Sequence, residues 1–307
     1  MSFIKKLPIP VCGLALGFAI LGNLLASYGV LYRYLCGAIS FMILLLFTIK
    51  TISNFSSFKK ELENPVVFSV LPTYTMALVL LSAYIKPFVG FVATFVWAFS
   101  LILHFIIAIC FFTTFILKFN IKTVFPSWFI PFVGFVVGSI TAPAMGQKGI
   151  GQILFYLGFI LYLVLLPIVL YRVFKIKQIP EPALPTLTII CAPISLCLAG
   201  YLSTFDTKNK ILVSIMLILC IISYLYVLYT MTKTLRIKFY PSYSAFTFPL
   251  VISAVALKMS SAYFAQGSNY FLSLLSRCSF SIALGAVLYV FVKYCIFLFF
   301  ADKKKSN

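Results

Sequence analysis

Acidic side chains are scarce in this sequence, and none of them lies within an apolar segment. The 307 residues include five acids, all in polar stretches: Glu61, Glu63, Glu181, Asp206 and Asp302. Proton relays and cation sites near the middle of a membrane normally use carboxylates placed there. Their absence argues against cation transport through buried carboxylates.

The residue patterns of an enzyme or a metal protein are missing as well. The single histidine, His104, belongs to no H-E-x-x-H motif, and no aspartate pair is present that could serve an intramembrane hydrolase. Eight cysteines lie scattered in apolar runs without C-x-x-C spacing, which is typical of small buried side chains. We therefore expect no catalytic residues, no cofactor and no metal, and interpret His104 as a hydrogen-bonded structural residue.

Apolar residues dominate what is present. They make up 63% of the chain, charged residues make up 9%, and the mean hydropathy is +1.13. A soluble domain could not hide so much apolar surface, so we predict an all-α polytopic membrane protein. Since a span needs about 20 apolar residues, the runs predict ten spans, at 8–30, 35–52, 66–85, 88–117, 128–146, 149–171, 183–204, 211–232, 241–265 and 272–300.

The net charge of +19 is distributed unequally between the two sides of these spans. The tails and the loops after even-numbered spans hold sixteen Lys and Arg residues, whereas the loops after odd-numbered spans hold five. Because cations favour the cytoplasmic side, we predict a multi-pass protein of the cell (inner or plasma) membrane with both termini in the cytoplasm. The charge thus fits a lipid bilayer as partner and gives no indication of nucleic acid.

Prolines reveal an internal repeat. Successive copies begin at Pro8, Pro65, Pro126, Pro182 and Pro241, at steps of 57, 61, 56 and 59 residues. We predict a single domain, residues 1–307, built from five two-helix units of about 59 residues. Odd spans are rich in proline, glycine and hydroxyl residues, whereas even spans carry large apolar side chains. Because broken helices need protein or water around them, we expect an inner ring of five Pro-kinked odd helices around a central pore, surrounded by the even helices.

Small residues in the odd spans are candidates to line such a pore. An anion path needs no acids, because backbone dipoles and helix ends can face it. Span 5 has small residues at intervals of four, and span 1 has two glycines at the same spacing. The alternative is a small-x-x-x-small face for helix packing. The candidates, with two prolines of odd spans, are Gly13, Gly17, Pro72, Gly134, Gly138, Ala142 and Pro193.

The ninth span carries two unusual features. Pro249 cannot donate to the carbonyl of Ala245, so the helix should kink where Phe248 projects, and a ring at a kink could plug a passage. The alternative is an ordinary packing or lipid-facing phenylalanine. Lys258, about 80° around the helix from Phe248, could attract anions in the outer part of the pore. Alternatively its stem runs along the helix and its ammonium reaches the outer interface.

Segments of the odd spans carry a resemblance to a known family. AFTFP (245–249), CAPISLCLAGYLS (191–203), VLPTYTM (70–76) and PIPVCGLALG (8–17) resemble the tellurite-resistance/dicarboxylate transporter family, which includes the bacterial tellurite-resistance channel homologue and the plant slow-type guard-cell anion channels. The resemblance covers essentially the whole chain. It implies a homotrimer whose protomers each have ten helices in five hairpins and their own pore. A phenylalanine of span 9 closes that pore, here Phe248, with Phe246 as the alternative.

The function that this resemblance implies is an anion channel or facilitator for small anions. The alternative within the family is a secondary transporter, for efflux or uptake, of C4-dicarboxylate, sulfite or tellurite-related anions. The lack of carboxylates in the spans favours passive conduction. Lys258 departs from what the family leads us to expect at its position.

Overall fold

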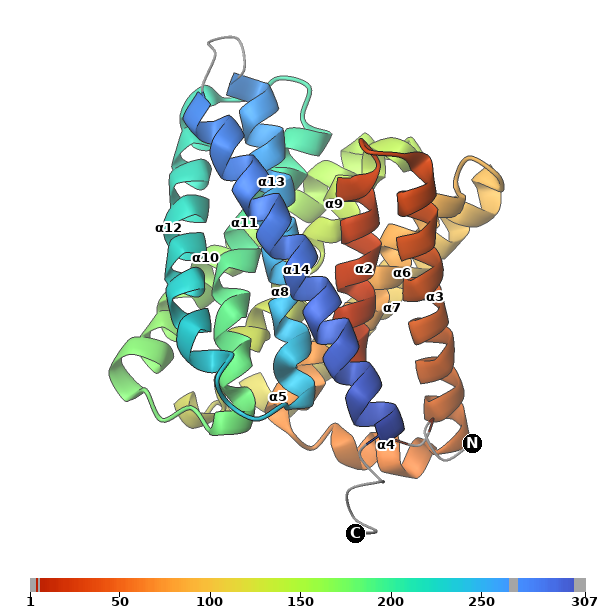
Figure 1. Cartoon of the computed structure of the whole chain (residues 1–307), viewed down its shortest axis with the longest axis vertical. Coiled ribbons are helices and arrows are strands. Elements are labelled where there is room, and N and C mark those ends of the chain that lie inside the picture. The colour runs from red at the N-terminus through yellow and green to blue at the C-terminus, as the bar shows by residue number, and fades with distance from the viewer. Residues whose placement is uncertain (1–3, 5, 265–269, 301–307) are drawn as a thin grey trace.

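The computed structural model describes residues 4, 6–264 and 270–300, and within them the chain is helical without a β-strand. Helices account for 84% of the structure (Figure 1). Among the described residues nine helices are long and apolar enough to cross a membrane, and α2 (Val11–Leu25) is a shorter apolar helix. The prediction of an all-helical membrane protein is confirmed, and the ten predicted spans correspond to these nine helices together with α2.

Five segments correspond to the odd-numbered spans. Each of the last four is built from more than one helical piece, and each contains prolines, which cannot donate a backbone hydrogen bond. They are α2; α5 (Pro65–Val70) with α6 (Thr73–Ile85); η3 (Pro126–Trp128) with α8 (Phe129–Val133) and α9 (Val136–Met145); η5 (Glu181–Cys191) with α11 (Ala192–Thr204); and η6 (Pro241–Phe246) with α13 (Phe248–Phe264).

The other five segments are long helices that correspond to the even-numbered spans. Two of them end in a π-helical turn, and a short helix and a 3-10 turn lie in the connections. These elements are α3 (Val30–Ser53), α7 (Gly90–Phe111) with η1 (Phe112–Ile116), α10 (Lys148–Tyr171) with η4 (Arg172–Ile176), α12 (Lys210–Thr234), α14 (Tyr270–Phe300), α4 (Phe55–Glu61) and η2 (Ile121–Thr123).

The two sets of segments differ sharply in burial. In the four odd segments after α2, between 72% and 89% of the most apolar stretch is buried, and thirteen of the fifteen residues of α2 are buried. In the even segments the share is between 22% and 33%. An apolar surface that faces lipid costs nothing to leave uncovered by protein. The even helices therefore present their large side chains outward, and the odd segments form the core.

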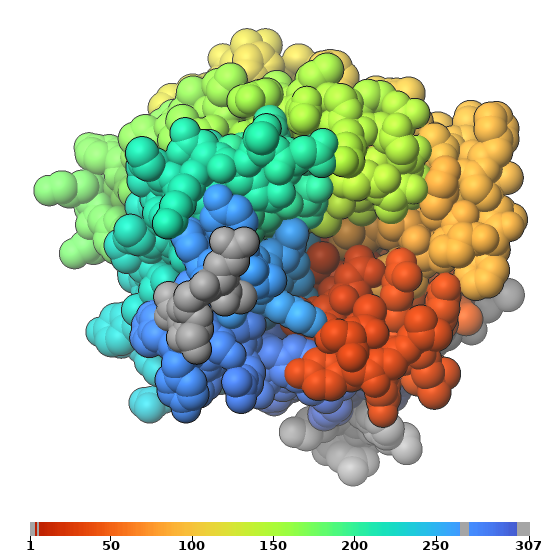
Figure 2. Space-filling model, turned by 90° about the horizontal axis from the view of Figure 1, so that it is seen from above, coloured from red at the N-terminus to blue at the C-terminus, as the bar shows by residue number. Residues whose placement is uncertain are grey.

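The buried helices pack in a closed order, α2 to α6, α6 to α9, α9 to α11, α11 to α13, and α13 back to α2. Each outer helix covers the junction of two of them: α3 packs on α2 and α6, α7 on α6 and α9, α10 on α9 and α11, α12 on α11 and α13, and α14 on α13 and α2. Figure 2 shows the segments following one another around the molecule in chain order. The start of α2 and the end of α14 lie at the same end of the molecule, the lower one in Figure 1.

Hydrogen bonds between neighbouring repeats join residues that are about one repeat length apart in the sequence. Ser69 donates to Ser127 at 2.6 Å, and the hydroxyls of Ser195 and Ser253 lie 2.9 Å apart, each pair being 58 positions apart. Ser242 donates to the carbonyl of Pro182, 60 positions away, at 2.5 Å. Corresponding parts of adjacent repeats therefore meet side by side, as expected when similar units are arranged around one axis.

Hydroxyl groups add hydrogen bonds to backbone carbonyls at and near the helix interruptions. Thr247, with φ −92° and ψ −85°, separates η6 from α13, and its hydroxyl lies 2.7 Å from the Ser244 carbonyl and 2.9 Å from that of Gly13. Ser253 donates to the carbonyl of Pro249, and Ser195 to that of Cys191. These bonds let non-α-helical backbone stay buried in the membrane interior.

Candidate functional site

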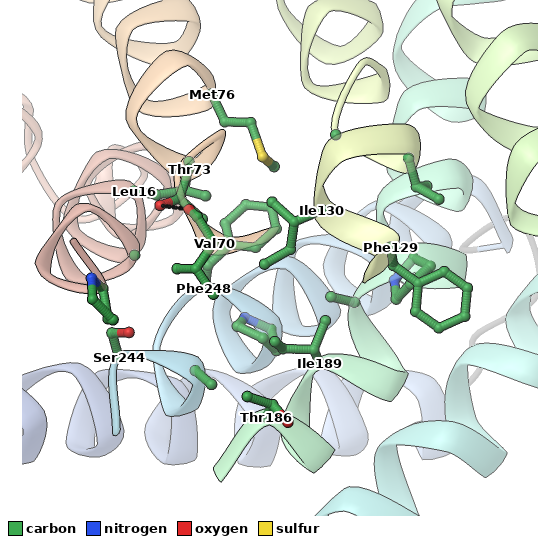
Figure 3. A pocket seen from close by; sticks show the side chains of 18 of the residues that line it. Leu16, Val70, Thr73, Met76, Phe129, Ile130, Thr186, Ile189, Ser244 and Phe248 are labelled. Carbon is green, nitrogen blue, oxygen red and sulfur yellow. Dashed lines mark hydrogen bonds between the residues drawn. The ribbon is translucent and has the colours of Figure 1, made fainter. Parts of the chain in front are cut away.

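A narrow cavity lies on the axis of the five buried segments, and every one of them contributes to its wall. The centre of a water-sized sphere can reach about 50 Å³ of it. The residues around it come from the first halves of the buried segments, nearer the end of the molecule where α2 begins and α14 ends. Figure 3 shows side chains such as Leu16, Val70, Ile130 and Phe248 pointing into this common space.

The lining residues recur in two layers. The first layer lies four or five residues after the repeat prolines and consists of Gly13, Val70, Ile130, Thr186 and Ala245. The second lies seven or eight residues after them and consists of Leu16, Thr73, Val133 with Gly134, Ile189 and Phe248. Equivalent positions of a repeat built around an axis face that axis together. Most of these residues were not among the candidates from the sequence, although their regular spacing from the repeat prolines indicates that they face the axis.

Phe248 has the largest side chain of the second layer. It is the first residue of α13 and is 7% exposed. Phe246, two residues earlier, is fully buried on another side of the chain. Its ring meets that of Tyr243 edge to face at 5.0 Å, and it borders a groove with Met231 of α12 and Ile282 of α14. Of these two phenylalanines, the structure places Phe248 at the axial cavity and turns Phe246 toward the outer helices.

The backbone on either side of Phe248 is held firmly. Thr247 is anchored on α2 by its bond to the Gly13 carbonyl, and Gly17 leaves room for it. A Cβ on Gly17 would lie 2.6 Å from both Cβ and Oγ1 of Thr247. Pro249 follows in the cavity wall. The interruption that orients Phe248 is thus fixed by a neighbouring buried helix.

The cavity wall is uncharged. None of the described residues that line it is acidic or basic, and three of its hydroxyl groups are engaged with backbone carbonyls. Thr73 donates to Val70 (Figure 3), Thr186 to Ala183, and Ser242 to Pro182. A wall of this kind offers an ion few strong partners, so it favours passage over tight binding.

The small residues predicted from the sequence divide into two groups. Gly13, Gly134 and Pro193 border the cavity, as does Pro249, whereas Pro72, Gly17, Gly138 and Ala142 are not among the residues around it. A Cβ on Gly138 would lie 2.6 Å from Leu154 and 2.9 Å from Leu101, on the outer helices α10 and α7. Ala142 faces Gly151 of α10. This part of the small-residue stripe packs helices together, which was the alternative interpretation.

Lys258 lies away from the cavity. Its exposed side chain donates to the hydroxyl of Ser27 at 2.7 Å and reaches the carbonyl of Leu24 at 3.4 Å, beside the C-terminal end of α2. A cation at this position compensates the partial negative charge of the helix end.

An exposed ion pair lies at the same end of the molecule. It joins Lys148, the first residue of α10, to Asp206 in the connection after α11, and the Lys148 ammonium holds the pKa of Asp206 below its usual value.

His104 connects two of the helix interruptions. It is buried on α7, where Nδ1 lies 2.8 Å from the hydroxyl of Thr75 and Nε2 donates to the carbonyl of Pro131 at 3.1 Å. Thr75 belongs to α6, and Pro131 to α8. These contacts are those of the structural histidine expected from the sequence.

In the described part of the chain, no three His, Cys, Asp or Glu side chains come together in a way that could hold a metal ion.

One comparison with known proteins bears on this geometry. A family model described as a voltage-dependent anion channel matches residues 6–295. The chain belongs to this family. It is the family that the sequence resemblance predicted, and the match spans every helix of the ring. No curated protein matches the chain. As a member of the voltage-dependent anion channel family, the protein is a helical membrane protein of a group of anion channels and transporters.

Proposed function

We propose that the protein passively conducts small monovalent anions along the axis of its five buried segments, and that Phe248 closes this path. The observation that carries the proposal is the axial cavity, which takes residues from every buried segment and has no charged side chain in its described wall. Gly13, Gly134 and Pro193 belong to the pore lining in this proposal. Family membership supports anions as the conducted species.

The proposed mechanism combines an apolar constriction with an electrostatic entrance. The ring of Phe248 fills the second layer of the cavity, and such a constriction excludes water and ions until it moves aside. The interruption at Thr247, which is anchored on α2, and Pro249 would set the direction of the ring, and the side chain of Phe248 itself would move aside. The many cations in the loops near this end of the molecule would raise the local anion concentration at the mouth.

The same proposal extends to the arrangement in the membrane. We infer that consecutive buried and outer segments form five hairpins, with kinks at the prolines of the buried ones. The packing of each outer helix on its preceding buried helix supports this arrangement. We further propose a homotrimer in the cell membrane with both termini in the cytoplasm, on the basis of the loop charges and the family.

Replacement of Phe248 by alanine tests the closure. With the ring removed, the second layer is open, and we expect anion flux in liposomes to rise by roughly an order of magnitude or more, because the apolar constriction is lost. Chloride, nitrate and malate should be compared side by side. The control is Phe246→Ala, which deletes an equally large and fully buried ring of the same segment that faces away from the cavity.

The comparison of the two variants separates gating from damage to the fold. Both lose a buried aromatic side chain, so both should lower the thermal stability of the purified protein, by about 3–5 kcal/mol in unfolding free energy. Only Phe248→Ala should raise flux. Equal flux in the two variants and the wild type would remove the gate assignment, and equally raised flux in both would point to a general leak.

A further inference from the structure

A groove on the outer surface, separate from the axial cavity, opens between α3 and α7. Its walls include Phe47 and Thr51 of α3 and Leu103 and Cys110 of α7, and its floor is formed by residues of α5 and α6. The centre of a water-sized sphere can reach about 380 Å³ of the groove, several times the volume that it can reach in the axial cavity. Nearly all of its side chains are apolar. In a bilayer such a groove lies among acyl chains.

The short helix α4 closes one end of this groove. In Figure 1 it lies across the end of the bundle. Phe58 of α4 and Leu62 after it reach the groove, and the ring of Phe58 meets that of Phe47 at 6.3 Å. An ion pair between the buried Lys50 and Glu61 ties the end of α3 to the end of α4. The position and the apolar face of α4 are those of a helix lying in the membrane interface.

The helix that closes this end of the groove also carries two cations. Lys59 and Lys60 of α4 follow Phe58 and are exposed, and neither side chain makes an ion pair or hydrogen bond within the described part of the chain. The hydroxyl oxygen of Thr51, in the groove wall, is buried and also lacks a hydrogen-bond partner there. Thr48, one helical turn away, instead bonds the Leu44 carbonyl and the hydroxyl of Tyr74. The groove thus combines an apolar length with an unsatisfied polar, positively charged end.

We propose that this groove is a binding site for one anionic phospholipid. An acyl chain occupies the apolar length between α3 and α7, and the phosphate lies beside Lys59 and Lys60 of α4. Basic residues next to an apolar groove at the cytoplasmic interface suit an anionic headgroup, each contributing roughly 1 kcal/mol of attraction. A zwitterionic lipid fits the groove equally well but gains less from the two lysines.

The bound chain would lie against the back of a segment that also lines the axial cavity. Phe68, Leu71 and Tyr74 face the groove, whereas Val70 and Thr73, between them in sequence, face the cavity. The lipid site is nevertheless independent of the proposed gate. Its test therefore measures lipid binding directly rather than anion flux.

Chemical modification of a cysteine in the groove can report whether a lipid occupies it. Cys110 is an exposed cysteine within it, and Cys278 on α14 is an exposed cysteine outside it, so the two can be compared in one molecule. The full chain, purified in detergent and delipidated, is treated with N-ethylmaleimide after addition of palmitoyl-oleoyl phosphatidylglycerol or the matching phosphatidylcholine. We expect phosphatidylglycerol to slow modification of Cys110 relative to Cys278 at lower concentration than phosphatidylcholine. Glycerol phosphate, which lacks acyl chains, should give no protection.

The lysines are tested by the double variant Lys59→Gln/Lys60→Gln. It should weaken protection by phosphatidylglycerol by roughly fivefold for each lysine removed and leave phosphatidylcholine unaffected. The control, Lys233→Gln/Arg236→Gln, removes two exposed cations from the end of α12, beside a different groove, and should behave as wild type.

Three results would overturn the proposal. Equal protection by the two lipids would remove the role of charge. An equal loss in the control variant would show a general effect of net charge. In the third result, Cys110 is modified slowly even without added lipid, and added lipid does not change the oligomeric state. A second copy of the chain would then cover the groove.

Discussion

At the scale of single residues, position around the backbone decides function more than residue type does. Phe246 and Phe248 have the same side chain and are both buried, yet one lies against outer helices and the other lies in the axial cavity. Two residues apart on a helical backbone, they point to nearly opposite sides, and the irregular backbone at Thr247 helps to set which of them faces the axis. The sequence could narrow the candidates to these two residues through family resemblance. It could not supply the dihedral angles that separate them.

Lys258 is a residue whose charge serves the fold in this structure. Its ammonium lies at the last carbonyls of α2, so Lys258→Met should lower the free energy of unfolding by about 0.3–1 kcal/mol. Anion flux should stay near the wild-type value, because the side chain does not reach the axial cavity. Thermal unfolding of the purified protein and flux in liposomes measure the two effects separately.

Lys210 provides a matched control for this variant. It is an exposed lysine on the same side of the molecule, at the first position of α12, where a positive charge is not favoured by the helix dipole. Lys210→Met should therefore cost no stability. A marked fall in flux for Lys258→Met, with unchanged unfolding, would contradict the structural role and favour an attraction of anions by Lys258.

At the scale of elements, much of the ring could be predicted from the sequence. The period of the prolines and the contrast between odd and even spans predicted which segments are buried, because burial and helix interruption follow directly from residue type. The form of the interruptions could not be predicted. The 3-10 segment η6 rises faster than an α-helix, so the five steps from Pro241 to Phe246 cover about 10 Å rather than about 7.5 Å. Phe248 thus lies deeper than an unbroken helix would place it.

The cavity lining was only partly predictable for a related reason. Small residues indicated where helices come close together. At Gly13 and Gly134 the close approach borders the axial cavity, whereas at Gly138 it packs the segment against outer helices. A stripe of small residues is compatible with either use. The distinction depends on which neighbours face the stripe, and those neighbours are set by contacts between segments far apart in the chain.

The packing of α2 against the interruption in the ninth span yields a prediction at this scale. In Gly17→Ala the new Cβ meets Thr247, which two hydrogen bonds hold in place, so the variant should lose about 1–3 kcal/mol of unfolding free energy. Gly138→Ala serves as the comparison, because its Cβ meets the ends of leucine side chains that can move aside. Thermal unfolding in detergent should rank Gly17→Ala below Gly138→Ala, and the reverse order would contradict this account of the break.

At the scale of the whole molecule, charge and core are separated. The described cavity wall is free of charge, while the cations are concentrated in the tails, the connections and the segment ends next to them, sixteen on the predicted cytoplasmic side and five on the other. In the proposed function, this arrangement would attract anions to the mouth without binding them within the passage. The same cations would hold the apolar ring in the proposed orientation, because cations in short loops resist transfer across the membrane.

In the proposed function, this separation favours passive conduction over coupled transport. Coupling to protons requires a group that takes up a proton along the path, and no acid or histidine borders the described cavity. We therefore expect the Phe248→Ala variant, in a planar bilayer with a chloride gradient, to carry a current that reverses at the chloride equilibrium potential. Imposing a pH gradient should leave that potential unchanged, and phosphatidylcholine bilayers with wild-type protein supply the background. A shift of the reversal potential with the pH gradient, or saturable uptake of malate, sulfite or tellurite driven by protons, would instead identify secondary transport and require a proton carrier outside the cavity wall.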